Sequence, residues 1–159
     1  MNKNVFEINN NPLNTNGAMG RLCFLNYSVL IFILSGFAIY SLCPTLSKIS
    51  SNPEIYQGKT FIEILSSGLP EEEIIFYVTC ILGYMVLSFI LNKKRFLDII
   101  GDVPHALKSA NTAAIVLFLL ALQVNFTIPQ GSTQATFISI GNLLIFFFMA
   151  LKKGNITKP

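Results

Sequence analysis

One short stretch of the chain gathers charged residues that could hold an ion pair or bind an anion. Lys93, Lys94 and Arg95 are followed closely by Asp98. Residues three or four apart share one face of a helix, so Asp98 can meet either Arg95 or Lys94. Together with Arg21, these residues form a candidate cluster for an internal ion pair or for the headgroups of anionic lipids.

Few other residues have the chemistry of a catalytic or metal site. His105 is the only histidine, and the three cysteines include no Cys-x-x-Cys pair. A zinc site needs several such ligands together, and a nucleotide site needs a glycine-rich motif that is absent here. We therefore expect no cofactor, no metal and no enzymatic activity. The enzymatic alternative is a lipid-modifying membrane enzyme with Asp98 or Asp102 at the headgroup plane.

The composition indicates which solvent surrounds this cluster. Apolar residues make up 52% of the 159 residues and charged residues only 12%. A soluble domain usually carries about twice that share of charge. The aromatic residues lie within apolar runs rather than beside basic residues, which argues against a nucleic-acid-binding surface. This composition is typical of an integral membrane protein.

Four apolar runs are long enough, or nearly so, to cross the hydrocarbon core, which takes about 18 residues or more. No Asp, Glu, Lys, Arg or His interrupts them, and backbone groups in lipid must be satisfied within the segment, which favours helices. The sequence therefore predicts an all-α membrane protein, a bundle of four transmembrane helices. The expected spans cover about 22–43, 74–91, 110–128 and 135–151.

The distribution of basic residues predicts the orientation of these spans, because Lys and Arg concentrate on the cytoplasmic side. Lys48 and Lys59 fall in the first loop between spans, residues 44–73. The other nine would all face the opposite side: Lys3, Arg21, Lys93, Lys94, Arg95, Lys108, Lys152, Lys153 and Lys158. We therefore expect both termini in the cytoplasm.

Outside the spans, the sequence predicts little regular structure. The asparagine-rich residues 1–20 read as a flexible cytoplasmic tail, residues 21–153 as the four-helix transmembrane domain, and residues 154–159 as a short cytoplasmic tail. Within the first outer loop, residues 58–65 place apolar side chains beside charges. We expect a short interfacial helix there.

Three amide side chains fall within the apolar runs. Asn26 lies near the inner end of the first run, Gln123 toward the outer end of the third, and Asn142 near the centre of the fourth. An amide in hydrocarbon needs a hydrogen-bonding partner, so we expect interhelical polar contacts from these residues. The alternative is that they line a path through the membrane.

Three motifs resemble those of the bacterial family called domain of unknown function 805. They are Gly20-Arg21-Leu22-Cys23-Phe24 at the first span, Lys94-Arg95-Phe96-Leu97-Asp98-Ile99 after the second, and Lys153-Gly154-Asn155 after the last. Leu97 stands where the family often has a histidine. The resemblance implies a small protein of the bacterial inner membrane with no established activity. It also implies that Arg21, Arg95 and Asp98 lie together at cytoplasmic helix ends.

These observations lead to one main functional hypothesis and one alternative. The main hypothesis is a non-enzymatic structural or accessory protein of the bacterial inner membrane. Its partners would be membrane lipids with anionic headgroups, further copies of the chain, or another membrane protein. The alternative is a component of a small oligomeric channel or transporter, in which the polar residues of the spans line the path.

Overall fold

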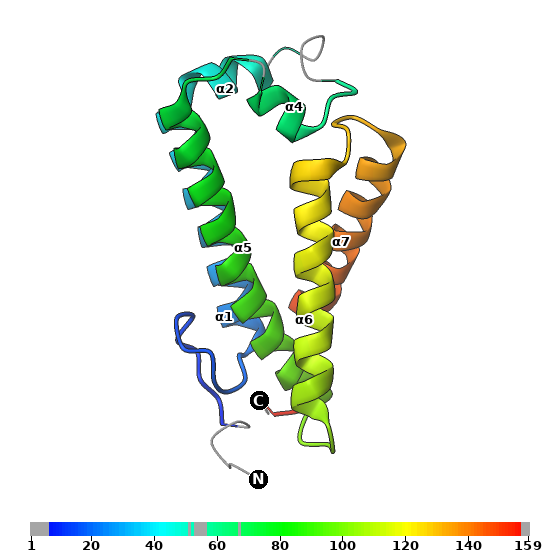
Figure 1. Cartoon of the computed structure of the whole chain (residues 1–159). Helices are drawn as coiled ribbons and strands as arrows, with labels where there is room; N and C mark the ends of the chain where they lie inside the picture. Colours follow the sequence, from blue (N-terminus) through cyan, green and yellow to red (C-terminus); the bar gives the residue numbers. More distant parts are fainter. Residues whose placement is uncertain (1–6, 51, 53–56, 67, 157–159) are drawn as a thin grey trace.

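Four long helices form the body of the protein in the computed structural model, which describes residues 7–50, 52, 57–66 and 68–156 (Figure 1). Each is long and apolar enough to cross a membrane, which confirms the predicted all-α membrane fold. They are α1 (Arg21–Leu42), α5 (Glu71–Ile100), α6 (Ala106–Leu122), which continues into a π-helical turn η2 (Gln123–Thr127), and α7 (Thr133–Leu151). Two short helices, α2 (Pro44–Ser50) and α4 (Phe61–Leu65), lie between α1 and α5.

The helix α5 is much longer than the span of residues 74–91 that the sequence predicts. It begins after Pro70 with Glu71, Glu72 and Glu73, and carboxylates in a first turn favour the positive end of the helix dipole. At its other end the helix continues through the basic stretch and stops at Gly101, whose φ of 82° favours glycine. The charged cluster therefore lies on the last two turns of α5, in the helical conformation that its spacing requires for Asp98 to meet Arg95.

The described segments before α1 and after α7 lie at the same end of the bundle, which we call the terminal end (Figure 1). The helices α2 and α4 cover the opposite end, which we call the loop end. The helices α5 and α6 lie close together at the terminal end and diverge toward the loop end (Figure 1). The even number of spans is what brings the segments before α1 and after α7 to one place.

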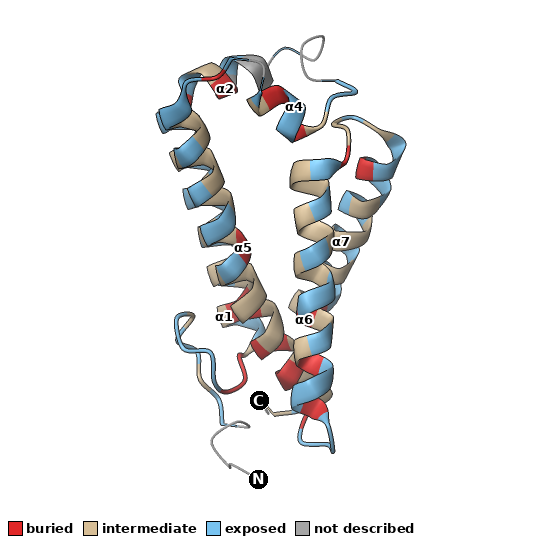
Figure 2. Ribbon diagram, in the orientation of Figure 1, coloured by how far each residue is buried: buried red, intermediate tan, exposed pale blue. Residues whose placement is uncertain are grey.

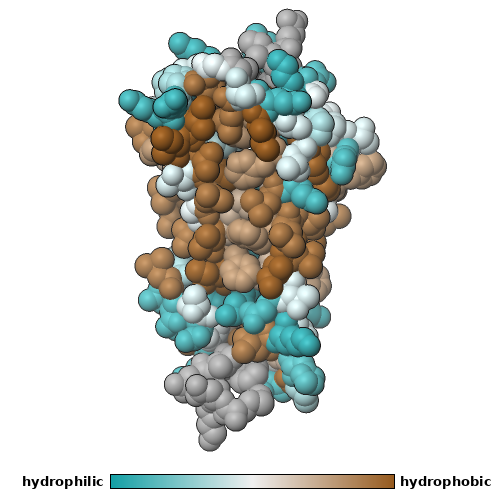
Figure 3. Space-filling model, in the orientation of Figure 1, coloured by the Kyte–Doolittle hydropathy of each residue, from teal (hydrophilic) through white to brown (hydrophobic). Residues whose placement is uncertain are grey.

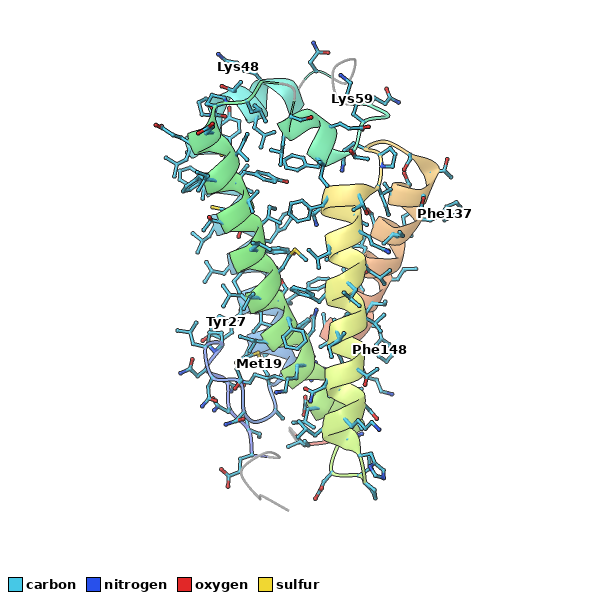
Figure 4. All side chains as sticks on the ribbon, viewed as in Figure 1. Met19, Tyr27, Lys48, Lys59, Phe137 and Phe148 are labelled. Atoms are coloured by element: carbon cyan, nitrogen blue, oxygen red, sulfur yellow. The ribbon has the colours of Figure 1, made fainter. Side chains whose placement is uncertain are left out.

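The surface along the spans is apolar, as it must be if lipid is the solvent. In the most apolar stretch of each spanning helix, only 6% to 11% of the residues are buried within the protein. Figure 2 shows buried residues mainly near the two ends, and Figure 3 shows an apolar belt between two hydrophilic ends. Phe137 and Phe148 project outward from α7 (Figure 4). In water, an apolar surface of this extent would drive aggregation.

The loop end is closed by a small apolar cluster under α2 and α4. Phe61 on α4 stacks on Tyr77 at a ring-centroid distance of 4.3 Å and meets Phe126 of η2 edge to face at 6.2 Å. Thr60 and Glu63 form a capping box that fixes the start of α4. These backbone and side-chain hydrogen bonds from Thr60 lower the pKa of Glu63. The expected helix of this loop thus covers Phe61–Leu65.

The two loops of this end are also joined through their backbones. The Gly58 N–H donates to the Gln130 carbonyl and the Gln130 N–H donates to the Lys59 carbonyl, each at 2.9 Å. In addition, the Glu73 carboxylate accepts hydrogen bonds from the Thr45 and Leu46 N–H groups at 3.0 and 3.1 Å, which satisfies donors at the start of α2. The loop end is therefore a folded cap.

Candidate functional site at the terminal end

Three charged side chains of α5 are completely buried at the terminal end. Lys94, Arg95 and Asp98 each have no exposed surface, and among the described residues they are the only buried charged side chains. Burying a charge is costly unless it is paired and hydrogen-bonded. Arg95 and Asp98 lie three residues apart on one helix face, and they form a buried ion pair.

The guanidinium of Arg95 also binds backbone carbonyl groups from two other parts of the chain. Its Nε donates to the Met149 carbonyl at 2.7 Å and its Nη2 donates to the Lys152 carbonyl, both at the end of α7. Its Nη1 donates to Asp98 and, at 3.5 Å, to the carbonyl of Met19, just before α1. The last carbonyl groups of a helix lack partners within it and carry its negative dipole end. Arg95 thus satisfies the end of α7 and joins it to α5 and to the start of α1.

The segment after α7 closes the end of α5 in return. The Asn155 N–H donates to the Asp98 carbonyl at 2.8 Å. The Asn155 side-chain amide donates to the carbonyl groups of Ile99 at 2.6 Å and Ile100 at 3.4 Å. Gly154 is buried against the Asp98 carboxylate, and a Cβ there would overlap the carboxylate atoms. The chain can follow this path only because residue 154 has no side chain.

Lys94 holds the segment before α1. Its Nζ donates to the carbonyl groups of Asn11 at 2.7 Å and Asn14 at 3.1 Å, and its own carbonyl accepts from the Met19 N–H at 3.3 Å. We call Lys94, Arg95, Asp98, Gly154 and Asn155 the terminal clamp. It joins both terminal segments to the last two turns of α5.

The segment before α1 is part of the tail that the sequence predicts to be flexible, and the structure describes its residues 7–20. Residues 7–20 form a loop in which Asn9 and Ala18 are hydrogen-bonded through their backbones at 2.8 Å. The side chains of Asn9, Asn11 and Asn14 each accept a hydrogen bond from the N–H two residues further on. Asparagine favours such turns, so the spacing of these residues was a signal for a loop. Residues 1–6 and 157–159 of the predicted tails lie outside the described part of the chain.

The charged residues of the predicted cluster differ in how far they are buried. Lys94, Arg95 and Asp98 come together inside the clamp. Arg21, the first residue of α1, is exposed, and Lys93 is only partly buried. The cluster therefore has an inner set that binds the protein's own backbone and an outer set that faces the surroundings. Gly154 and Asn155 were not among the site residues that the sequence predicted. Both belong to the third of the motifs that resemble the family.

The three amide side chains of the spans do not form the interhelical hydrogen bonds that we expected within the described part of the chain. Asn26 and Gln123 are exposed, and Asn142 is partly buried. Within the described part of the chain, none of the three side chains forms a hydrogen bond to another helix. Asn26 and Gln123 lie near the ends of their helices, where lipid headgroups or water can satisfy an amide, so no partner helix is required. Asn142 lies on the wall of a cavity instead.

No protein-family model, curated protein or solved structure matches the chain. The three motifs on which the expected family resemblance rests lie near one another at the terminal end. Phe24 of the first motif packs against Leu91 and Met149, Arg95 and Asp98 belong to the second, and Gly154 to the third. Among the described residues, no three His, Cys, Asp or Glu side chains are close enough to hold a metal ion. The contacts that the described residues form at this site are an ion pair and hydrogen bonds.

Replacing Arg95 should destabilise the protein far more than replacing its neighbour Lys93. Arg95→Met removes the guanidinium that pairs with the buried Asp98 and binds the carbonyl groups of Met19, Met149 and Lys152. Breaking a buried pair of this kind costs about 3–5 kcal/mol of unfolding free energy. Lys93→Met alters a partly exposed charge and should change this free energy by about 0.5 kcal/mol or less. Reversible unfolding in detergent micelles measures both. Equal effects of the two substitutions would contradict a clamp built on Arg95.

Adding one methyl group at residue 154 should also open the clamp. Gly154→Ala places a Cβ where the Asp98 carboxylate lies, and overpacking of this kind costs about 1–3 kcal/mol. Gly83→Ala on α5 is the matched control, because nothing lies within 4 Å of a Cβ at that residue. The same unfolding experiment should find Gly83→Ala neutral or slightly stabilising. A Gly154→Ala protein as stable as the wild type would show that the terminal segment lies elsewhere.

Proposed function

We propose that the chain is a non-enzymatic structural or accessory protein of the bacterial inner membrane. Four apolar helices make it a multi-pass membrane protein in composition and length. The observation that carries the proposal is the use made of its buried charges. The Lys94 and Arg95 donors bind backbone carbonyl groups of the terminal segments, and Arg95 also pairs with Asp98. The buried charged side chains of α5 therefore hold the chain together.

The proposed orientation places the terminal end in the cytoplasm. Among the described basic residues, only Lys48 and Lys59 belong to the loop end (Figure 4). That end also carries the acidic residues of the first loop and of the α5 start: Glu63, Glu71, Glu72 and Glu73. The remaining described basic residues all belong to the terminal end, and a bias of this kind sets orientation during insertion. The resemblance to a bacterial inner-membrane family supports the same location.

The outer basic residues suit contact with anionic lipid headgroups. Arg21 is exposed at the first residue of α1, and Lys108, Lys152 and Lys153 are exposed around the same end. Basic residues at a membrane surface attract anionic lipid with about 1 kcal/mol each. The large exposed apolar surface of the spans leaves room for a second copy or another membrane protein. An accessory role uses these two kinds of contact.

Labelling of single cysteines tests the orientation. In a background without the three native cysteines, Ser66→Cys places a thiol at the loop end and Lys153→Cys at the terminal end, both at exposed residues. A membrane-impermeant maleimide should label Ser66→Cys in spheroplasts, and Lys153→Cys only after lysis. The reverse pattern would overturn the orientation, and labelling of both in intact spheroplasts would overturn insertion as proposed.

One observation favours the alternative function as a channel or transporter component. Asn142 lies on a cavity wall within the bundle, although Asn26 and Gln123 do not. The accessory role predicts that liposomes containing the protein show no ion or solute flux above empty liposomes. Flux that is present in the wild type and lost in Asn142→Leu would instead favour the alternative. Asn26→Leu serves as the control, because its amide is exposed away from the cavity.

A further inference from the structure

A cavity of about 540 Å³ lies among the spanning helices, with walls from α1, α5, α6 and α7. Phe32 of α1 and Leu143 of α7 belong to its wall, yet they are 67% and 53% exposed. The cavity therefore opens to the apolar surface of the protein. A molecule dissolved in the bilayer could enter it sideways without crossing a headgroup layer. This consequence depends on the proposed membrane location, but not on the accessory role.

The wall of the cavity is largely apolar and contains hydrogen-bonding groups from three helices. The hydroxyl and amide side chains on it are those of Ser28, Tyr84, Ser88, Asn92, Ser139 and Asn142. Within the described part of the chain, none of these six forms a side-chain hydrogen bond. No polar side-chain atom there is both sealed from the surface and unpartnered. The six groups are therefore accessible to an occupant.

Unpaired hydroxyl and amide groups are costly at this depth. An amide or hydroxyl without a partner in an apolar environment costs about 1–3 kcal/mol by protein mutational data. The tails of the lipids cannot supply a partner. Asn142 lies near the middle of α7, away from the headgroups, whereas Ser88 lies toward the terminal end of the apolar part of α5. An occupant that carries hydrogen-bond acceptors would remove this cost.

The wall also limits the charge and shape of the occupant. None of the described residues on it is Asp, Glu, Lys, Arg or His, so an ionised group would be buried there without a counter-ion from them. Four phenylalanines lie on the wall, and Phe89 and Phe118 form an edge-to-face pair at 6.1 Å. Aromatic side chains of this kind pack well against a flat ring. An uncharged flat head with carbonyl groups, followed by a hydrocarbon tail, matches every one of these features.

We propose that the cavity binds an uncharged isoprenoid-type quinone of the membrane. The ring carbonyl groups accept hydrogen bonds from the Asn142 amide and from hydroxyl donors such as Ser88. The ring lies against the phenylalanine side chains, and the tail leaves through the opening beside Phe32 and Leu143. The quinone binds without any chemical step. It assigns to this chain a ligand that the accessory role does not require.

Binding of a short-chain decyl benzoquinone to the purified full-length protein in phosphatidylcholine nanodiscs tests the proposal. We expect saturable binding and a concentration-dependent rise in Tm. Asn142→Leu and Ser88→Ala each remove a donor and should raise the Kd about tenfold, the effect of one lost hydrogen bond. Asn26→Leu replaces an exposed amide on α1, and this variant should bind the quinone with the Kd of the wild type. Tm values without quinone confirm that each variant is folded.

Three outcomes would overturn the quinone proposal. Absence of saturable binding would mean that the cavity holds only water or lipid tails. An equal rise in Tm with hexadecane or diacylglycerol would mean that the cavity accepts any hydrocarbon chain. Unchanged Kd values in both folded cavity variants would place the quinone elsewhere. None of these outcomes affects the clamp or the orientation, which unfolding and cysteine labelling test separately.

Discussion

The structure depends on one constraint, which is that the end of a helix leaves backbone carbonyl groups without partners. At the terminal end, α5 and α7 both finish where the chain must turn back. Arg95 satisfies the end of α7, and Asn155 satisfies the end of α5. The Arg95 cation is tolerated because it lies at the negative dipole end of α7. The Asp98 carboxylate is tolerated because it pairs with Arg95 on the same helix face. A guanidinium suits this position since its donors form a planar fork, which a lysine ammonium lacks.

Lipid as the solvent explains why so much of the stability must come from such end contacts. Lipid tails are as apolar as leucine, so packing helices together gains little from the hydrophobic effect. The spans bury few residues, and α1 has Phe24 as its only buried one. The folded ends compensate for the small buried surface of the spans. The loop end has an aromatic cluster around Phe61, and the terminal end has the clamp. The middle of the bundle is left loose enough to contain a cavity.

Sequence reasoning predicted the elements of the fold better than the contacts between them. Uncharged apolar runs identify spanning helices because no other backbone arrangement satisfies its own groups in lipid. The same rule could not show that Lys94 and Arg95 turn inward, because a basic stretch beside a span usually faces the headgroups. The contacts of Gly154 and Asn155 could not be predicted from the sequence, because they depend on where α5 ends. Asn26 and Gln123 were expected to pair across helices, but amides near helix ends have headgroups and water as competing partners.

Hydrogen–deuterium exchange in nanodiscs measures most directly whether the clamp unites the two terminal segments. The account predicts slow exchange of the Ala18, Met19 and Asn155 amides, whose N–H groups are bonded to Glu7, Lys94 and Asp98. It also predicts that both segments lose protection together in Arg95→Met, because one side chain holds them. Exchange at the rate of unstructured chain in the wild type would contradict the central claim. Loss of protection in only one segment would contradict it as well.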